Sequence, residues 1–303
     1  MKNFNGKVAV ITGAASGFGK EFAIAGAALG MKLVLADVQQ LPLDATVAAL
    51  AATGADVVGL RCDVSKGEEV EALAQLALSA FGGINLLFNN AGVGSGGLIW
   101  ENTVKDWEWV LGVNVWGVIH GVRIFTPLML EQAKREPDYE GYIVNTASMA
   151  GLLSPQLMGA YNLSKHAVVS LSETLFHDLH SVTSQIGCSV LCPAFVPTGI
   201  SNSHRSRPAE LQNETSPTES MVVAQKMTHK AVSSGKMTAT DVAQITFEAI
   251  RENRFYIVTH PKIMATVKMR LEDIEHLQNP RDPFALKQEN RPQLDLTVPK
   301  ASA

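Results

Sequence analysis

The strongest constraint on the fold is a regular alternation of two kinds of segment along the chain. Seven runs are short, apolar and rich in β-branched residues, and the stretches between them are longer and rich in Ala, Leu, Glu and Lys. Strands that alternate with helices imply right-handed βαβ crossovers and a parallel sheet. The runs are nearly continuous in apolar residues, as expected when helices cover both faces of the sheet. The predicted strands are 7–13, 32–38, 56–64, 84–92, 141–148, 187–194 and 255–260.

Two regions fall outside this rhythm. The connection from about residue 199 to 236 is long, and a connection of that length in a compact domain usually serves as a lid. Residues 276–303 are polar and rich in proline, which predicts a tail that either lies extended on another surface or has no fixed structure. We therefore expect one α/β domain over residues 1–275, with a doubly wound, seven-stranded parallel sheet of the Rossmann type, a lid at about 199–236 and a C-terminal tail.

The composition narrows the class of partner. Of the 303 residues, 46% are hydrophobic and 18% are charged, and the net charge is −4. Such a protein is a poor match for nucleic acid or an acidic membrane surface, and no apolar run approaches the roughly 20 residues of a membrane span. No signal peptide is apparent, and the three cysteines lack metal-ligand spacing. We expect a cytoplasmic protein with reduced thiols, no metal and a small-molecule partner.

The segment TGAASGFGKEFA lies between the first predicted strand and the helix that follows it. Its glycines, Gly13, Gly17 and Gly19, allow a tight turn and a close approach of backbone amides to a ligand. The N-terminus of the following helix favours an anionic group. The spacing is Gly-x3-Gly-x-Gly rather than the common Gly-x-Gly-x2-Gly. By itself it is compatible with a dinucleotide site or with a turn that binds nothing.

Asp37 ends the second predicted strand, 18 residues after the last of these glycines. An acidic residue at that place can accept hydrogen bonds from both hydroxyls of an adenosine ribose, and it repels a 2′-phosphate. No Arg or Lys stands at Ser16, Val38 or Gln39 to offset that repulsion. The sequence therefore favours NAD over NADP. NADP remains the alternative if the lid contributes a cation such as Arg205.

Polar or glycine-rich residues also follow the next four predicted strands. Asp63 ends the third strand, NNAG (89–92) the fourth, Ser148 the fifth and PAFVPT (193–198) the sixth. Ligands bind at the carboxyl ends of the strands in sheets of this kind. Because turn chemistry alone does not explain the same pattern on five consecutive strands, we expect the ligand site along this edge.

The segment YNLSK places Tyr161 and Lys165 one turn apart on one face if it is helical. A phenol beside an ammonium group is either ordinary surface decoration or an acid–base pair, and roughly 0.2 matches to Tyr-x3-Lys arise by chance in such a chain. The ordered set of TGAASGFG, NNAG, Ser148 and Tyr161-x3-Lys165 is far more specific. From about residue 6 to about residue 260, it resembles the short-chain dehydrogenase/reductase family of the single-domain type.

This resemblance implies that Asn114 joins Ser148, Tyr161 and Lys165 as the catalytic residues. Lys165 would lower the pKa of Tyr161, which takes up or returns the hydroxyl proton while hydride moves to or from the cofactor. Ser148 would hold the substrate oxygen, and Asn114 would hold a water that relays protons. The NAD site would comprise Gly13, Ser16, Gly17, Phe18, Gly19, Asp37, Asp63, Val64, Asn90, Ala91, Gly92, Tyr161, Lys165, Val196 and Thr198.

The predicted substrate pocket is roomy and apolar, and the glycines at 94–97 leave space on one wall. With the long lid, this favours a bulky, mostly apolar secondary alcohol, including aryl-bearing ones, or its ketone. The alternatives are a steroid, a hydroxyacyl or other anionic substrate held by Arg205 and Arg207, and a non-catalytic nucleotide-binding protein on the same fold. The expected lining of the pocket is Met149, Leu153, Met158 and Phe195.

Two further expectations concern surfaces. The helices over about 114–132 and 161–182 are apolar enough to form subunit contacts, so we expect a homodimer or homotetramer. Four tryptophans, at 100, 107, 109 and 116, are expected to serve packing, and Trp100 is the one that could reach the substrate.

Overall fold

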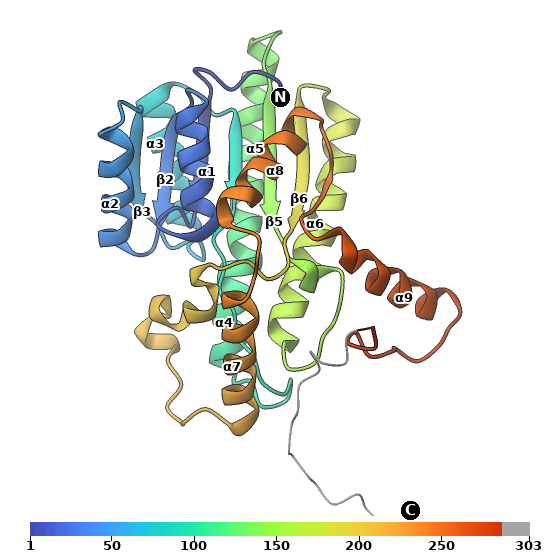
Figure 1. Ribbon diagram of the computed structural model, residues 1–303. Coiled ribbons are helices and arrows are strands. Elements are labelled where there is room, and N and C mark those ends of the chain that lie inside the picture. The colour runs from blue at the N-terminus through green and yellow to red at the C-terminus, as the bar shows by residue number, and fades with distance from the viewer. Residues whose placement is uncertain (287–303) are drawn as a thin grey trace, which may run out of the picture.

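The computed structural model describes residues 1–286 of the chain. Within them, seven strands form one sheet in the order β3-β2-β1-β4-β5-β6-β7 (Figure 1), and every strand pair is parallel. The predicted doubly wound sheet is thus confirmed. The strands are β1 (Val8–Thr12), β2 (Lys32–Asp37), β3 (Val57–Arg61), β4 (Leu86–Asn89), β5 (Gly141–Thr146), β6 (Ile186–Cys192) and β7 (Tyr256–Val258).

Helices cover both faces of this sheet. One face packs against α1, α2 and α8, and the other packs against α3, α5 and α6. These two layers form because each connection between parallel strands must cross over the sheet. The helices are α1 (Gly17–Ala28), α2 (Gln40–Ala51), α3 (Gly67–Phe81), α5 (Gly117–Arg135), α6 (Gly159–Val182) and α8 (Ala239–Arg251).

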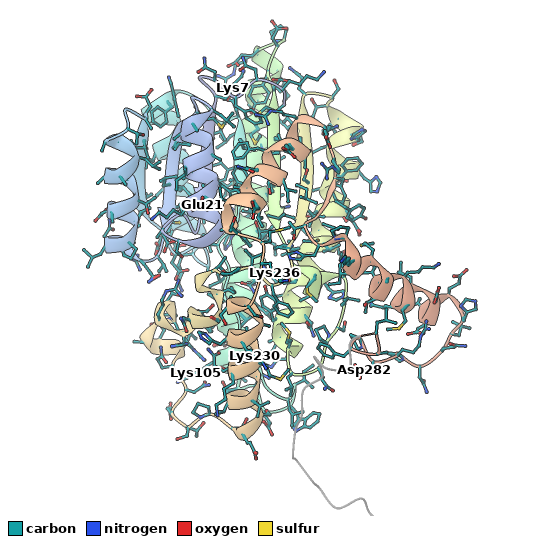
Figure 2. All side chains as sticks on the ribbon, in the orientation of Figure 1. Lys7, Glu21, Lys105, Lys230, Lys236 and Asp282 are labelled. Carbon is teal, nitrogen blue, oxygen red and sulfur yellow. The ribbon has the colours of Figure 1, made fainter. Side chains whose placement is uncertain are left out.

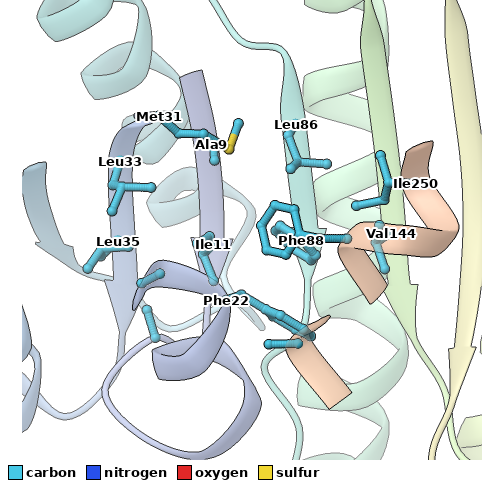
Figure 3. Packing of buried hydrophobic residues seen from close by; sticks show 14 of the residues in the cluster. Ala9, Ile11, Phe22, Met31, Leu33, Leu35, Leu86, Phe88, Val144 and Ile250 are labelled. Atoms are coloured by element: carbon cyan, nitrogen blue, oxygen red, sulfur yellow. The ribbon is translucent and has the colours of Figure 1, made fainter. Parts of the chain in front are cut away.

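Alternate residues of each strand supply the two layers of the core. In β1, Ile11 faces the α1 side and Val10 faces the opposite side, and both are fully buried. Figure 3 shows Phe22 of α1 against Phe88 of β4, and the two rings stack with centroids 4.4 Å apart. Burial of one such side chain contributes about 1.5–3 kcal/mol. The continuous apolar runs therefore correspond to strands buried on both faces in β1, β2, β4, β5 and β6, whereas the edge strands β3 and β7 are partly exposed.

A single long helical segment runs from α4 (Val104–Leu111) through one π-helical turn, η1 (Gly112–Trp116), into α5. By length and composition the stretch Val104–Arg135 could cross a membrane. In the fold it is a core helix, because Phe125 and Met129 on its inner face are fully buried against the sheet. Nothing in the sequence predicted the π-helical turn.

The segment between β6 and α8 does not run as a bare loop. It forms the short 3₁₀ helices η3 (Gly199–Ser206) and η4 (Ala209–Leu211), and then α7 (Glu219–Ser233). Figure 1 shows both α7 and α4 beyond the ends of the strands. We call residues 98–111 and 199–236 together the α4–α7 lobe. This lobe contains the whole predicted lid.

After β7, η5 (Pro261–Ile263) leads into α9 (Met264–Glu275), which projects away from the sheet (Figure 1). The sequence pattern did not predict this helix. The side chain of Arg281 folds back on it and donates to Asp273 at 2.5 Å. Of the predicted tail, 276–303, only residues 276–286 fall within the described part of the chain.

Candidate active site

A cavity of about 500 Å³ lies between the carboxyl ends of the strands and the α4–α7 lobe, a size typical of small-molecule sites. Figure 2 shows Lys7, which precedes β1, and Lys105, in the lobe, at opposite ends of the molecule. The predicted site residues that line this cavity are Gly13, Ser16, Gly17, Phe18, Asp37, Asp63, Val64, Asn90, Ala91, Gly92, Ser148, Tyr161, Lys165, Val196 and Thr198.

The glycine-rich turn is shaped by two different requirements. Gly17 has a φ of +54°, a left-handed conformation that residues with a side chain rarely adopt. Gly19 is buried, and a β-carbon there would overlap the carbonyl oxygen of Gly13. Gly19 therefore lets α1 approach β1 closely, and it is not among the cavity-lining residues. Ser16 is the N-cap of α1, and its side chain makes no capping hydrogen bond.

Asp37 stands at the end of β2 with its carboxylate held in place by backbone amides. Ala15 N donates to Oδ2 at 3.0 Å and Gln39 N donates to Oδ1 at 2.9 Å. Burial raises the pKa of Asp37, and the two backbone donors and the charge of Arg205 only partly offset that rise. The result is a fixed acceptor at one end of the cavity.

The ends of β3 and β4 form the next part of the wall. Asp63 accepts hydrogen bonds from the amide and the hydroxyl of Ser65, at 3.0 and 2.7 Å, which fixes the turn after β3. Glu69 on α3 accepts from the backbone N of Asp63 at 2.7 Å. Asn90 donates from its side-chain amide to Thr12 O at 2.9 Å. Asn90 therefore ties the end of β4 to that of β1 while its neighbours line the cavity.

Ser148, Tyr161 and Lys165 meet at the other end of the cavity. Ser148 follows β5, and its Oγ accepts from Ala150 N at 3.1 Å. Tyr161 and Lys165 lie one turn apart on α6, with the Lys165 Nζ 5.6 Å from the centroid of the tyrosine ring. The Nζ is buried and donates to Thr146 O at 2.9 Å. The residues of YNLSK are thus part of a built cluster and not surface decoration.

Burial dominates the protonation of this cluster. It raises the pKa of Tyr161, and a hydrogen bond with the Ser148 side chain only partly offsets the rise. It also lowers the pKa of Lys165 to about 8. The expectation that Lys165 lowers the pKa of Tyr161 is therefore not met in the protein alone. The reason is that desolvation of the phenolate is the larger effect, and Lys165 itself holds its proton less firmly.

Asn114 lies in the π-helical turn and is almost fully buried. Its Oδ1 accepts from Val93 N at 2.8 Å, and its Nδ2 donates to Val93 O at 2.9 Å and to Ser164 Oγ at 3.0 Å. A β-carbon on Gly92 would be 3.5 Å from both Asn114 Oδ1 and Lys165 Nζ. The Asn114 side chain thus joins η1 to the segment after β4 and to α6, where its partner Ser164 directly precedes Lys165. Asn114 does not itself line the cavity.

The four residues predicted for the substrate pocket are not part of the lining of this cavity. Leu153 is buried, Phe195 is 38% exposed, and Met158 pairs with Gly97 in a parallel bridge. Their role, like that of Met149, stays a prediction. The expectation that the glycines at 94–97 leave open space is wrong at Gly96 and Gly97, whereas a β-carbon on Gly94 would make only ordinary contacts with Ile200. A β-carbon at Gly96 or Gly97 would collide with α7, so these glycines let α7 pack closely.

The lobe contributes lining residues that sequence reasoning missed. They come from segments roughly 100 residues apart, so no local motif marks them. Trp109 packs in a buried apolar cluster, as expected, and it also lines the cavity. Trp100, the tryptophan expected to be able to reach the substrate, is 76% exposed and is not a lining residue. The missed lobe residues with side chains are Glu108, Trp109, Ile200, Ser203, Ser206, Pro208, Glu210, Leu211 and Val232.

Arg207 is buried and already paired. It donates to Asp106 Oδ1 at 2.6 Å, and its guanidinium lies 5.1 Å from the ring centroid of Trp109. Burial alone would raise the pKa of Asp106, but hydrogen bonds from Thr103, Arg207 and Asn213 hold the pKa below its usual value. This ion pair fastens the 199–236 segment to α4.

Comparison with known proteins gives consistent matches. Residues 7–209 match the short chain dehydrogenase family. The chain is 36% identical to the "CLA biosynthesis dehydrogenase/reductase" of Lactiplantibacillus plantarum over 90% of this chain and 95% of that protein. It is 31% identical to the "C alpha-dehydrogenase" of Sphingobium sp. (strain NBRC 103272 / SYK-6) over 90% and 87% of the two chains. A short-chain dehydrogenase/reductase from Burkholderia phymatum, crystallised with NAD, is 61% identical, with a TM-score of 0.91 over 93% of this chain and 99% of that chain.

Proposed function

Because this chain belongs to the short-chain dehydrogenase/reductase family, we propose that it is an NAD-dependent oxidoreductase that interconverts a secondary alcohol and its ketone. One observation carries the proposal. The fixed carboxylate of Asp37 and the glycine-rich turn share a single cavity with the Ser148–Tyr161–Lys165 cluster. An adenosine-binding end and an acid–base end in one cavity is the arrangement that hydride transfer with a dinucleotide requires.

The residues present fit NAD. Two backbone amides already orient the Asp37 carboxylate, which leaves further lone pairs for a ribose diol. The N-terminus of α1 opens beside Ser16, whose hydroxyl makes no capping bond, and it would favour the pyrophosphate. The NAD bound to the 61% identical relative supports the same assignment here. When bound, NAD supplies the hydride acceptor and a positive charge at the nicotinamide.

Tyr161 is the general acid and base in this proposal. Ser148 and Tyr161 line the same end of the cavity, so one substrate oxygen can contact both hydroxyls. In alcohol oxidation Tyr161 takes the hydroxyl proton, and in ketone reduction it returns one. Lys165, charged below about pH 8, stabilises the phenolate and can hold ribose hydroxyls. Asn114 fixes the backbone around Val93 beside the lysine, where a proton-relaying water would be held.

The substrate is proposed to be bulky and mostly apolar, including aryl-bearing alcohols or ketones. Trp109, Ile200 and Leu211 give the lobe side of the cavity large apolar surfaces. The competing anionic or hydroxyacyl substrate needs free cations near the reacting carbon. Arg207 is paired with Asp106, and Arg205 lies at the Asp37 end, so neither is placed for that role.

We further propose a homodimer or homotetramer, with the α4–α5 and α6 surfaces as contacts. Trp116 and Leu163 lie on these helices and are about half exposed. Large apolar side chains on an open face are typical of subunit interfaces. Sedimentation velocity tests this directly, because Trp116→Glu is expected to shift the species toward monomer, whereas an unchanged sedimentation coefficient would contradict it.

The function is tested by a substrate screen with the purified protein. We expect NADH absorbance changes with bulky secondary alcohols or their ketones, and higher kcat/KM for 1-aryl alkanols than for small aliphatic alcohols or hydroxyacyl thioesters. Higher kcat/KM for the small alcohols would contradict the apolar pocket. NAD binding without turnover on any alcohol or ketone would favour the non-catalytic nucleotide-binding alternative.

A further inference from the structure

Arg205 belongs to the lobe, and its positive charge lies at the adenosine end of the cavity. It lies on η3, and its Nη1 donates to the carbonyl oxygens of Gly199 and Asn202, at 2.6 and 2.9 Å. Its Nε donates to Gln39 Oε1 at 3.2 Å, and its Nη2 lies 3.5 Å from Ser16 Oγ. The guanidinium therefore bridges the root of the lobe and the two loops that enclose Asp37.

Ser16 and Gln39 are two of the three positions at which the sequence lacks a cation to offset Asp37. They flank that carboxylate in space, since Gln39 N and Ala15 N both donate to it. Arg205 supplies a positive charge beside these two positions, although it lies 166 residues after Gln39 in the chain. Ser16, Asp37, Gln39 and Arg205 all line one cavity. The fold thus places beside Asp37 the lid cation that the sequence left as a condition for NADP binding.

We propose that Arg205 is a specificity-determining residue that lets the adenosine end accept a 2′-phosphate in spite of Asp37. The lobe, and not the sheet, then sets how strongly the protein rejects NADP relative to NAD. This inference rests on the proposed NAD site. It goes further in assigning cofactor discrimination to a residue outside the glycine-rich turn and the end of β2.

The chemistry of the two groups supports this assignment. A guanidinium presents a planar fork of donors that matches phosphate oxygens, whereas a carboxylate repels them. Two backbone carbonyls hold one nitrogen of Arg205, so the group is oriented before any ligand binds. The side chain is exposed, which screens its charge. We therefore expect a contribution of about 5-fold to 10-fold in affinity for a 2′-phosphate, and not a complete switch.

Two nucleotide fragments isolate the 2′-phosphate without any need for turnover. Calorimetry would measure the binding of 2′,5′-ADP and of 5′-AMP to the full-length protein, because the fragments differ only in that phosphate. Arg205→Gln is expected to weaken 2′,5′-ADP by about 5-fold to 10-fold and 5′-AMP by less than about 2-fold. Arg205→Lys keeps the charge and should retain part of the affinity for 2′,5′-ADP.

Lys20→Gln is the matched control, since it removes one exposed positive charge from α1 at a residue that does not line the cavity. It should leave both affinities unchanged. Asp37→Asn should strengthen 2′,5′-ADP, and adding Arg205→Gln should remove most of that gain.

The outcomes separate this inference from the proposed function. If 5′-AMP binds and Arg205→Gln leaves the ratio of the two affinities unchanged, Arg205 only ties the lobe to the sheet and the inference is overturned. An equal loss for both fragments would overturn it as well. If the unaltered protein binds neither fragment, the proposed cofactor site fails, and this inference fails with it.

Discussion

The interactions that stabilise the sheet differ from those that stabilise the α4–α7 lobe. The sheet is built from fully buried apolar side chains, such as Phe22 and Phe88, whose rings stack between α1 and β4. Polar contacts join the two segments of the lobe, which lie far apart in the chain, to each other. A polar contact also joins the lobe to the end of the sheet, where the Ser203 hydroxyl accepts from Gly94 N, beyond β4, at 3.0 Å. Arg207 pairs with Asp106. The hydroxyl of Ser220, at the start of α7, donates to the Glu101 carboxylate and accepts from Leu98 N at 2.8 Å.

This difference separates two tasks. The proposed chemistry uses Ser148, directly after β5, and the Tyr161–Lys165 pair on α6, and these elements are fixed by the core. The proposed selection of substrate and cofactor uses Trp109 and Arg205 from the lobe. Apolar packing gives rigidity, whereas polar attachments can open locally at lower cost. A change in the sheet should therefore affect the whole protein, and a change in the lobe should affect binding first.

The largest expected effect is in the sheet. Phe88→Ala removes a fully buried ring and should lower the free energy of unfolding by about 3–5 kcal/mol. Urea denaturation measures it. Ile24→Ala on α1, where the side chain is 41% exposed, is the control and should cost less than about 1 kcal/mol. Equal costs for the two variants would contradict the assignment of stability to the two-sided core.

The lobe should respond differently. Arg207→Met leaves Asp106 buried without its ion-pair partner, which costs about 3–5 kcal/mol where the charge stays buried. We expect much of that cost to appear as local opening, seen as faster hydrogen exchange over 199–233 and a raised KM, with a smaller change in the urea midpoint. A loss of global stability as large as that of Phe88→Ala, with no local change in exchange, would show that the lobe is part of the same cooperative unit.

Lys165 tests whether a buried residue that the proposed reaction needs lowers the stability of the fold. The folded protein lowers its pKa to about 8 from 10.5, so below pH 8 the buried ammonium destabilises the fold. Lys165→Met should therefore be more stable by about 1–3 kcal/mol at pH 7, and inactive. The stability difference between Lys165→Met and the unaltered protein should shrink as the pH rises from 8 toward 10.5. Over that range the folded protein has already released the lysine proton and the unfolded chain releases it progressively. A less stable Lys165→Met variant at pH 7 would contradict this explanation.

The smallest effect is expected at an exposed contact of the lobe. Lys105 and Glu214 form an ion pair at 3.2 Å, and Glu214 is 89% exposed. Glu214→Gln should change the free energy of unfolding and KM by amounts near the limit of measurement, less than about 0.5 kcal/mol. A large rise in KM would mean that exposed pairs, and not the Arg207–Asp106 pair, hold the lobe in place.

The same contrast explains what the sequence could predict. The strands and their parallel arrangement could be predicted from the apolar runs, because burial on both faces leaves a continuous apolar pattern in the sequence. The edge of the sheet at which the cavity lies could be predicted from Asp37, Ser148 and the Tyr161–Lys165 pair, because the carboxyl ends of parallel strands meet at one edge. These features depend on local composition and on general rules of chain topology.

The remaining features depend on contacts that no local pattern encodes. The position of Arg205 beside Ser16 and Gln39 joins residues that are 189 and 166 apart in the chain. The glycines at 94–97 were interpreted as open space because the approach of α7 was not visible in the sequence. The direction of the Tyr161 pKa in the protein alone depends on the depth of burial, which spacing along a helix does not give.

The central claim is that Tyr161 transfers the proton in a hydride-transfer reaction at this cavity. The most direct measurement is single-turnover NADH formation or consumption with Tyr161→Phe, using a substrate from the screen, alongside NADH binding followed by fluorescence. We expect the rate to fall by at least about 100-fold while the affinity for NADH changes little, since only the acid–base group is lost. A near-normal rate in Tyr161→Phe with NADH still bound would contradict the account.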